Sequence, residues 1–253
     1  MRSTWINWLL RRTTADSSNT PALAPGNQFY AVGDIHGRLD LLQALLVQLE
    51  PACPIVFVGD YIDRGAQSAQ VLRYLHALSL SPDRKVICLM GNHEEMLLQF
   101  LETPAYTNRL WLRNGGLQTL ASFGVTGVDE TIADEDAPTV ADALRAAMGD
   151  DLILWLQSLP LTWSSGNVTA VHAALDPNRP LEHQHKQTCL WGHRQFGRSP
   201  RDDGQWVIHG HTIQTSPRVA SGVISIDTGA FMTGRLTAAE VSPSGVRFVS
   251  TGQ

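Results

Sequence analysis

Side chains of metal-binding type follow short apolar runs at five places in this sequence. Each run has the length of a buried strand, and at four of the five a glycine directly precedes the polar side chain and lets the backbone turn sharply. The residues concerned are Asp34 and His36, Asp60, Asn92, His172 and His211. Active sites collect at the carboxyl ends of strands in open α/β sheets. We therefore expect these side chains to converge on one site.

The donor types in this set favour a site for two divalent metal ions. Asp34 and His36 are two residues apart, so in an extended segment both side chains lie on one face and can bind one ion. The carboxylate of Asp60 can bridge to a second ion. Mixed oxygen and imidazole ligands suit Mn²⁺, Fe or Zn²⁺ rather than Ca²⁺. Two such ions about 3.5–4 Å apart can hold a phosphoryl group and generate hydroxide at neutral pH. Taken singly, each residue is more often a turn residue, a helix cap or a core histidine.

Strands alternate with helices in the first hundred residues. The segments with strand-like or helical apolar spacing are, in order, 29–32, 39–49, 55–58, 68–78, 86–90 and 94–101. This alternation indicates βαβ units and a largely parallel sheet that is covered on both faces.

The pattern changes twice in the rest of the chain. Residues from about 103 to 165 contain two stretches with helical spacing and an acidic loop at 129–137, which predicts a helical cap insertion. Short strand-like runs follow at 168–171, 206–209, 223–226, 236–241 and 246–249 and indicate a second sheet, mixed or antiparallel. We therefore expect an α/β fold with two packed mixed β-sheets flanked by α-helices, formed by residues 28–253.

Composition narrows the classes of function. The 253 residues carry a net charge of −5, which argues against a nucleic-acid-binding surface. A phosphorylated substrate stays possible, because metal ions and an arginine can reverse the field inside one pocket. Three scattered cysteines, Cys53, Cys88 and Cys189, make no disulfide framework and favour a reducing, cytoplasmic location. No apolar run is long enough to predict a transmembrane segment.

Residues 1–27 are expected to form an N-terminal tail and linker. Trp5 to Leu10 is apolar and is followed by two arginines, so residues 1–12 could contact a membrane surface as an interfacial anchor. A frayed or self-docked amphipathic turn is the interpretation that we prefer. Residues 13–27, rich in Ser, Thr, Pro and Ala, are typical of a linker.

Together these motifs resemble the phosphoprotein phosphatase family, in its small bacterial and phage form, within the calcineurin-like metallophosphoesterase superfamily. The family signatures GDxHG, GDxxDRG and GNHE are intact at 33–37, 59–65 and 91–94. The segments 111–116 and 226–229 also match the small bacterial branch. The resemblance covers about 28–241 and implies the calcineurin-like metallophosphoesterase fold.

The resemblance also implies a role for each matching residue. The implied ligands are Asp34, His36 and Asp60 for the first metal, and Asp60, Asn92, His172 and His211 for the second. His93 would be the general acid that protonates the leaving alcohol, with Asp63 orienting its imidazole, and Arg64 would bind the phosphate oxygens. A hydroxide bridging the two ions, with Mn²⁺ expected and Fe or Zn²⁺ as alternatives, would attack phosphorus directly without a covalent phosphoenzyme.

One departure from the family pattern concerns a second phosphate contact. The small bacterial branch commonly has Trp-x-Arg before the Gly-His motif, whereas this chain has His193 at the expected place and Arg194 one residue later. We expect Arg194 to bind phosphate because a guanidinium stays charged at any pH. His193, Arg198 and Arg201 remain alternatives.

Three functions are compatible with these motifs. Glu94 and Asp63 favour a protein serine/threonine phosphatase that acts on a phosphorylated protein or peptide, because hydrolases of symmetrical dinucleoside tetraphosphates typically carry GNHD and lack the second acid of GDxxDRG. Such a hydrolase of small phosphate compounds is the alternative within the same fold. A non-catalytic phosphopeptide-binding scaffold is the third, and the intact set of ligands counts against it.

Overall fold

The computed structural model describes residues 20–198 and 200–252. The expected interfacial segment at 1–12 and the first part of the expected linker, 13–19, lie outside these residues. From Thr20 to Gly26 the chain runs along the second sheet, where the Trp206 indole donates to the Pro21 carbonyl and the Ala24 N–H donates to Asn167 Oδ1. No helix of the described residues is long and apolar enough to cross a membrane.

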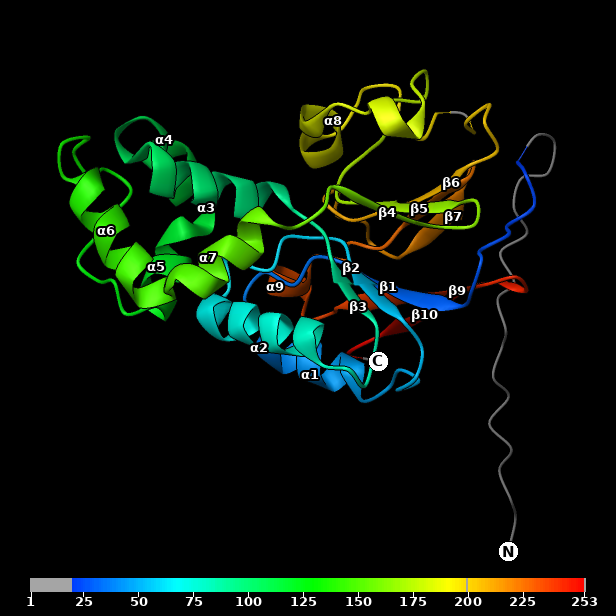
Figure 1. Cartoon of the computed structure of the whole chain (residues 1–253), viewed down its shortest axis with the longest axis horizontal. Helices are drawn as coiled ribbons and strands as arrows, with labels where there is room; N and C mark the ends of the chain where they lie inside the picture. Colours follow the sequence, from blue (N-terminus) through cyan, green and yellow to red (C-terminus); the bar gives the residue numbers. More distant parts are fainter. Residues whose placement is uncertain (1–19, 199, 253) are drawn as a thin grey trace, which may run out of the picture.

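Two mixed sheets pack face to face, as predicted (Figure 1). The first has the order β10(Gly245–Ser250)-β9(Thr237–Ser242)-β1(Phe29–Val32)-β2(Ile55–Phe57)-β3(Val86–Cys88). The second has the order β4(Thr162–Ser165)-β5(Val168–Val171)-β6(Trp206–His209)-β8(Val223–Ser225)-β7(Arg218–Ala220). The three central strands of the second sheet and β1, β2 and β3 of the first are parallel, whereas β9, β10, β4 and β7 run antiparallel to their neighbours.

Alternating side chains of the first sheet fill two separate cores. Tyr30 and Val32 of β1 point toward the helices that cover the sheet, while Phe29 and Ala31 point toward the second sheet. Because both faces are buried, the strand is apolar throughout rather than alternately polar. This explains why continuous apolar runs predicted the parallel strands well.

Helices cover the outer faces and one end of the sandwich (Figure 1). α1(Leu39–Leu46) and α2(Ser68–Leu80) lie along the first sheet, and α3(Asn92–Glu102) leads from β3 away from the sheets. The segment expected as a cap contains α4(Pro104–Trp111), a kinked turn at Leu112–Gly116, α5(Leu117–Ser122), α6(Ala137–Met148) and α7(Asp150–Gln157). Short helices α8(Lys186–Trp191) and α9(Ala230–Thr233) belong to the later half.

Two features of the second sheet differ from the prediction. The runs at 236–241 and 246–249 form β9 and β10, which belong to the first sheet because β9 pairs with β1. Placing them in the second sheet was wrong. The edge strands β4 and β7 were not predicted, since an edge strand with one face in solvent needs few apolar residues.

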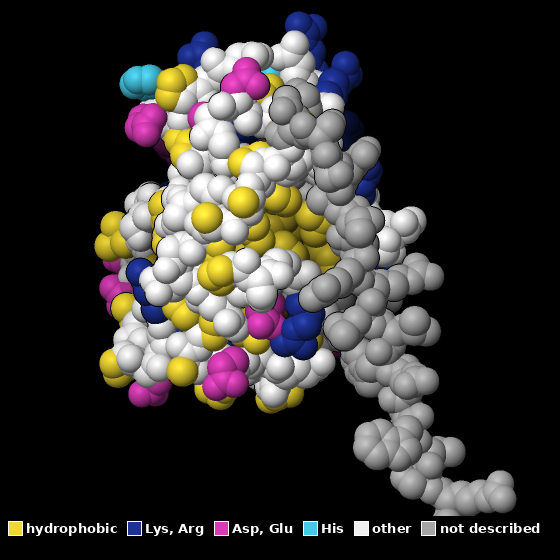
Figure 2. Space-filling view, turned by 90° about the vertical axis from the view of Figure 1, so that its right-hand side faces the viewer, with side chains coloured by type: hydrophobic (Ala, Val, Ile, Leu, Met, Phe, Trp, Pro, Cys, Tyr) yellow, Lys and Arg dark blue, Asp and Glu magenta, His cyan; other side chains and the backbone are white. Residues whose placement is uncertain are grey.

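The hydrophobic core between the two sheets extends to the surface on one face of the molecule. Half-buried Trp163, Val219, Val246 and Phe248 pack against the core that separates the sheets. Figure 2 shows hydrophobic side chains gathered in a hollow at the middle of the face that lies opposite the cap helices.

Candidate dinuclear metal centre

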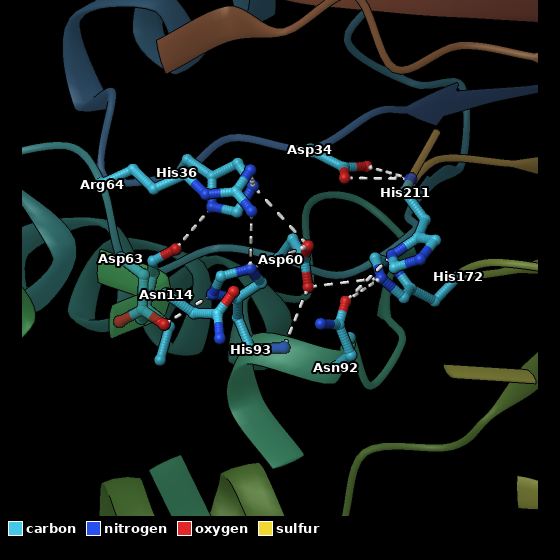
Figure 3. A network of polar contacts seen from close by, with 12 residues as sticks. Asp34, His36, Asp60, Asp63, Arg64, Asn92, His93, Asn114, His172 and His211 are labelled. Atoms are coloured by element: carbon cyan, nitrogen blue, oxygen red, sulfur yellow. Dashed lines mark hydrogen bonds and ion pairs between the residues drawn. The ribbon is translucent and has the colours of Figure 1, made fainter. Parts of the chain in front are cut away.

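The six predicted metal ligands lie together where the two sheets meet (Figure 3). The first sheet supplies Asp34, His36, Asp60 and Asn92 from the segments after β1, β2 and β3, and the second supplies His172 and His211 after β5 and β6. Five of them are buried, and His211 is partly exposed. The carboxyl ends of parallel strands from both sheets therefore face one site, as expected for this class of fold.

Asp60 lies in the middle of the cluster, with one carboxylate oxygen toward each side. Its Oδ2 is 3.6 Å from Nε2 of His36 and 3.8 Å from Nε2 of His93, and its Oδ1 is 3.3 Å from Nε2 of His172. The donor atoms of His36, Asp60 and His93 lie within 4.8 Å of one another, as do those of Asp60, His172 and His211. Asp60 thus belongs to two adjoining donor groups, as a bridging carboxylate must.

Backbone carbonyls orient two of the imidazoles toward Asp60. Nδ1 of His36 is 2.7 Å from the carbonyl oxygen of Ile62, and Nδ1 of His172 is 3.0 Å from that of Val58. A carbonyl can only accept, so each Nδ1 carries the proton and each Nε2 keeps its lone pair for a metal ion.

Asn92 belongs to the second donor group. Its Oδ1 lies 2.8 Å from Nε2 of His172 and 3.0 Å from Nδ1 of His211. An amide oxygen and two imidazole nitrogens therefore surround one point beside the Asp60 carboxylate, as Figure 3 shows.

Asp34 and His36 are positioned by a turn, so the extended geometry that we expected for them is wrong. The N–H groups of Ile35 and His36 both donate to the Asp60 carbonyl, and His36 adopts a φ of +46°. His36 therefore reaches the Asp60 carboxylate. Asp34 lies outside the two close donor groups, and its oxygens accept the His211 N–H at 3.0 and 3.1 Å.

Burial gives the ligands the protonation states that metal binding needs. It lowers the pKa of His36 to about 3 and that of His172 to about 4, so both imidazoles are neutral at pH 7. Burial disfavours ionisation of Asp60 as well, but the nearby imidazoles of His172, His93 and His36 outweigh it and hold the pKa of Asp60 below its usual value.

Three carboxyl groups lie close together around Asp34. Burial raises the pKa of Asp34 well above its usual range, and Asp227 and Asp60 raise it further. Burial also raises the pKa of Asp227 to about 6. A divalent cation relieves such repulsion between buried carboxylates. Neutral imidazoles, carboxylates and one amide oxygen therefore fit two ions of the Mn²⁺, Fe or Zn²⁺ type.

His93 is paired with Asp63 and faces the cluster. Its Nδ1 donates to Asp63 Oδ2 at 2.6 Å, and both side chains are buried. Burial alone would lower the pKa of His93, but the carboxylates of Asp60 and Asp63 outweigh it and raise that pKa above its usual value. His93 therefore keeps its proton to higher pH than an ordinary histidine does, and its Nε2 is directed toward Asp60.

Two residues that we had given no role hold Asp63 in place. The Trp111 indole N–H lies 3.1 and 3.2 Å from the two Asp63 oxygens, and the Thr119 hydroxyl donates to Oδ1 at 2.6 Å. Trp111 belongs to the motif at 111–116, which could have signalled it. Thr119 carries no signal in the sequence.

Arg64 lies across the mouth of the cluster. Its guanidinium N–H groups lie 3.0 Å from Nε2 of His36 and 3.2 Å from Nε2 of His93, and its plane stacks 4.8 Å from the centre of the Phe231 ring. The kinked turn at Leu112–Gly116 supports it, since the Arg64 N–H donates to the Gly115 carbonyl. A planar cation held at this place can bind the oxygens of a phosphoryl group.

Glu94 does not face the open site. Its buried carboxylate accepts the backbone N–H groups of Asp60, Tyr61 and Gly91 at 2.8 to 3.1 Å. It therefore ties the loop after β2 to the start of α3. The identity of this residue reports on loop architecture, so it does not discriminate between substrates as we had reasoned from the sequence.

The residues considered for a second phosphate contact lie apart from the cluster. Arg194 is exposed, and no hydrogen bond or ion pair in the described part of the chain joins it to the metal-ligand set. His193 is half-buried, with Nε2 3.9 Å from Asp176 Oδ2. Arg201 is buried and paired with Asp203, and it also donates to the carbonyls of Asp176 and Arg179.

Backbone strain is concentrated at this site. Six non-glycine residues of the described chain have a positive φ, and five of them belong to the predicted set, namely His36, Asp60, Asp63, Arg64 and His211. Each such conformation costs about 1–3 kcal/mol and persists only where surrounding contacts enforce it. These backbone conformations turn the side chains concerned toward the predicted metal site.

Comparison with known proteins gives the family context of this geometry. The family model described as "Calcineurin-like phosphoesterase" matches residues 28–214. The symmetrical bis(5′-nucleosyl)-tetraphosphatase of Nitrosococcus oceani is 32% identical over 153 residues, which is 58% of this chain but only 44% of that protein. The chain thus spans less than half the length of such relatives.

Two further relatives match different portions. The asymmetrical bis(5′-nucleosyl)-tetraphosphatase PrpE of Oceanobacillus iheyensis is 26% identical over 82% of this chain and 86% of its own length. Serine/threonine-protein phosphatase 2 of Escherichia coli is 41% identical over 90 residues, 34% of this chain and 38% of that protein.

Solved structures share the fold at low identity. A structure described as a candidate diadenosine tetraphosphatase is 21% identical, with a TM-score of 0.61 over 93% of this chain and 100% of that one. The cold-active protein-tyrosine phosphatase of a psychrophilic Shewanella species is 16% identical, with a TM-score of 0.58 over 98% and 89%.

Proposed function

This chain belongs to the calcineurin-like phosphoesterase family, and on that premise we propose that it hydrolyses bis(5′-nucleosyl) tetraphosphates with two divalent metal ions, Mn²⁺ being the expected metal. The observation that carries the proposal is the carboxylate of Asp60, which two adjoining donor groups share. Relatives named for this activity support the substrate class, and one of them, PrpE, aligns along most of the chain.

The residues of the site divide the work of hydrolysis. Bound metal ions would supply an activated water and neutralise charge on the phosphoryl group. The Arg64 guanidinium would hold phosphoryl oxygens. One water is consumed: its oxygen becomes bonded to phosphorus, and the bond from phosphorus to the leaving oxygen breaks. Nε2 of His93 would give the leaving oxygen a proton, and His93 would regain a proton from solvent, to which the attacking water has lost its own. Asp63 keeps Nδ1 of His93 protonated, so Nε2 is the nitrogen that exchanges the proton.

A protein serine/threonine phosphatase is the second candidate. The match to Serine/threonine-protein phosphatase 2 and the presence of Asp63 in GDxxDRG favour it. Its substrate would be a phosphorylated protein or peptide, whose alkoxide leaving group depends on a general acid more than a nucleotide does. Glu94 no longer supports this candidate, because its carboxylate is engaged by backbone N–H groups.

A comparison of rates separates the two candidates. Mn²⁺-loaded protein is assayed on bis(5′-adenosyl) tetraphosphate and on a phosphoserine or phosphothreonine peptide, and the products are separated by chromatography. We expect the larger kcat/KM for the dinucleotide, with two ADP as the products of symmetrical cleavage or ATP and AMP as those of asymmetrical cleavage. A larger kcat/KM for the peptide would favour the protein phosphatase. Activity on neither, with both metal ions bound, would favour the non-catalytic scaffold.

A further inference from the structure

A cavity of about 270 Å³ lies against the second sheet, between the loop after α8 and the strands β7 and β8. Two of its lining residues directly follow predicted ligands in the chain, Ala173 after His172 and Thr212 after His211. The loops that carry these ligands therefore also form the cavity wall. Its volume is close to the lower end of the range for ligand pockets, about 300 Å³, which suits one ring-sized group rather than a whole dinucleotide.

One wall of the cavity includes an aromatic ring. Phe196, in the loop after α8, is half-buried and contacts the His209 ring edge to face, with ring centres 4.9 Å apart. His209 is itself fixed on β6, because its Nδ1 lies 2.8 Å from the Gly210 carbonyl and its Nε2 2.8 Å from Ser225 Oγ. The Phe196 ring is therefore held against the second sheet by its contact with His209.

Hydrogen-bonding groups complete the lining. Gln214 is half-buried, and its Nε2 donates to the Thr212 carbonyl at 3.2 Å, so its side chain is oriented by the same loop that carries His211. Arg218 on β7 is exposed at the rim. None of the lining residues is acidic, although the chain as a whole is. The cavity therefore suits a planar, polar ligand that is neutral or attached to negative charge.

We propose that this cavity binds one nucleoside of a dinucleoside polyphosphate, with the base against Phe196 and the phosphate chain leading past Thr212 to the metal centre. This inference rests on the proposed function, since the phosphate chain is what connects the cavity to the centre. Gln214 hydrogen-bonds the edge of the base, and Arg218 contacts the ribose or the first phosphate. His193 lines the same cavity. It occupies the place of the family's phosphate-binding arginine, and in this chain it would face the nucleoside.

Direct binding of adenosine tests the cavity without depending on turnover. Titration calorimetry of Mn²⁺-loaded protein with adenosine is expected to give saturable binding. Stacking of a base on an aromatic side chain is typically lost on alanine substitution, so we expect Phe196→Ala to weaken adenosine binding about 10-fold and Phe196→Tyr to preserve it. The matched control is Tyr106→Ala, which removes an exposed aromatic ring on α4 and should not change the binding.

The same variants are then compared by catalysis. Phe196→Ala should lower the ratio of kcat/KM for bis(5′-adenosyl) tetraphosphate to that for p-nitrophenyl phosphate about 10-fold, and Gln214→Ala should lower it in the same direction. Using a ratio removes any general loss of folded or metal-loaded enzyme. Absence of saturable adenosine binding to the wild type, or an unchanged dissociation constant and ratio in both variants, would overturn the nucleoside site while leaving the proposed hydrolysis intact. Adenosine binding that depends on Phe196, without cleavage of the dinucleotide, would support the site and overturn the proposed function instead.

Discussion

The pairing of His93 with Asp63 places a proton donor beside the metal ligands without making it one of the implied ligands. Nδ1 is committed to Asp63 at 2.6 Å, so Nε2 is the nitrogen that can exchange a proton with a substrate. Trp111 and Thr119 fix the carboxylate from behind. The imidazole therefore has both a defined tautomer and a defined direction.

Substitution of His93 tests its role as general acid. His93→Asn should lower kcat on alkyl phosphates by about 10²–10⁴, because an amide cannot give a proton to the leaving alkoxide. The loss should shrink on p-nitrophenyl phosphate, whose leaving group needs little protonation. Metal content measured alongside should stay near that of the wild type. Equal losses on both substrates would contradict the role.

Asp63 should set the pH range in which His93 acts. The carboxylates of Asp60 and Asp63 raise the pKa of His93, so its acid form persists above the usual pKa of histidine and is lost as pH rises through the raised value. Asp63→Asn removes one of these charges, and the alkaline limb of the kcat–pH profile on an alkyl phosphate should move to lower pH. Asp203→Asn, remote from the site, serves as the control. An unmoved limb would show that His93 does not limit the rate.

At this scale the sequence predicted the residue types better than their geometry. His36 was expected in an extended segment, yet it reaches Asp60 through a turn with a positive φ. Glu94 was interpreted as a substrate marker, although its carboxylate binds backbone N–H groups. Motif spacing conveys which side chains occur together, whereas the direction of each depends on contacts with residues far away in the chain.

At the scale of elements, the backbones of neighbouring strand ends pack closely against each other, and this packing positions the predicted ligands. A Cβ added to Gly91, between β3 and α3, would lie 2.3 Å from both N and Oδ1 of Asp60. The loop after β2 therefore packs directly on the backbone of the next strand end. No side chain larger than hydrogen fits there without displacing the Asp60 carboxylate.

Gly91→Ala should consequently weaken both folding and metal binding. We expect a loss of about 1–3 kcal/mol in the free energy of unfolding, measured by urea denaturation, together with a reduced metal content after dialysis. The matched control is Gly26→Ala, because a Cβ at Gly26 meets its nearest neighbour at an ordinary 3.4 Å. If Gly91→Ala retained wild-type metal content, the packing would not be what positions Asp60.

Sheet membership was the part of the fold that periodicity could not supply. The apolar spacing of 236–241 and 246–249 identified β9 and β10 as strands, but it does not indicate which strand each one pairs with. Pairing with β1 follows from the free edge that β1 offers once β2 has paired on its other side. Most elements were thus predictable from local pattern, apart from the edge strands β4 and β7, and their order in the sheets was not.

At the scale of the whole molecule, the metal centre joins the two sheets. Four predicted ligands come from the first sheet and two from the second, and Asp34 already links them through the His211 N–H. Ions bound between them would act as a tie across the sandwich. Binding to the native state alone stabilises it by mass action.

Thermal unfolding should therefore depend on metal. Mn²⁺ at 100 times its dissociation constant should stabilise the protein by about 2.7 kcal/mol, which raises Tm by about 5–10 °C for a chain of this size. Calorimetry of chelator-treated protein with and without added Mn²⁺ measures the shift. Asp60→Asn should reduce it, because the shared carboxylate is lost. An equal shift in wild type and variant would place the bound ions elsewhere.

The contact between Asp34 and His211 spans 177 positions of the chain. A polypeptide leaving the ribosome has exposed Asp34, His36, Asp60 and Asn92 long before the strand that carries His211 exists, and the edge of β1 stays open until β9 arrives. Contacts between residues so distant along the chain form slowly, because the chain loses entropy on closing the loop before the contact contributes any stability. Metal uptake should accordingly coincide with the last and slowest phase of folding, because only then do the donor groups of the second sheet join those of the first.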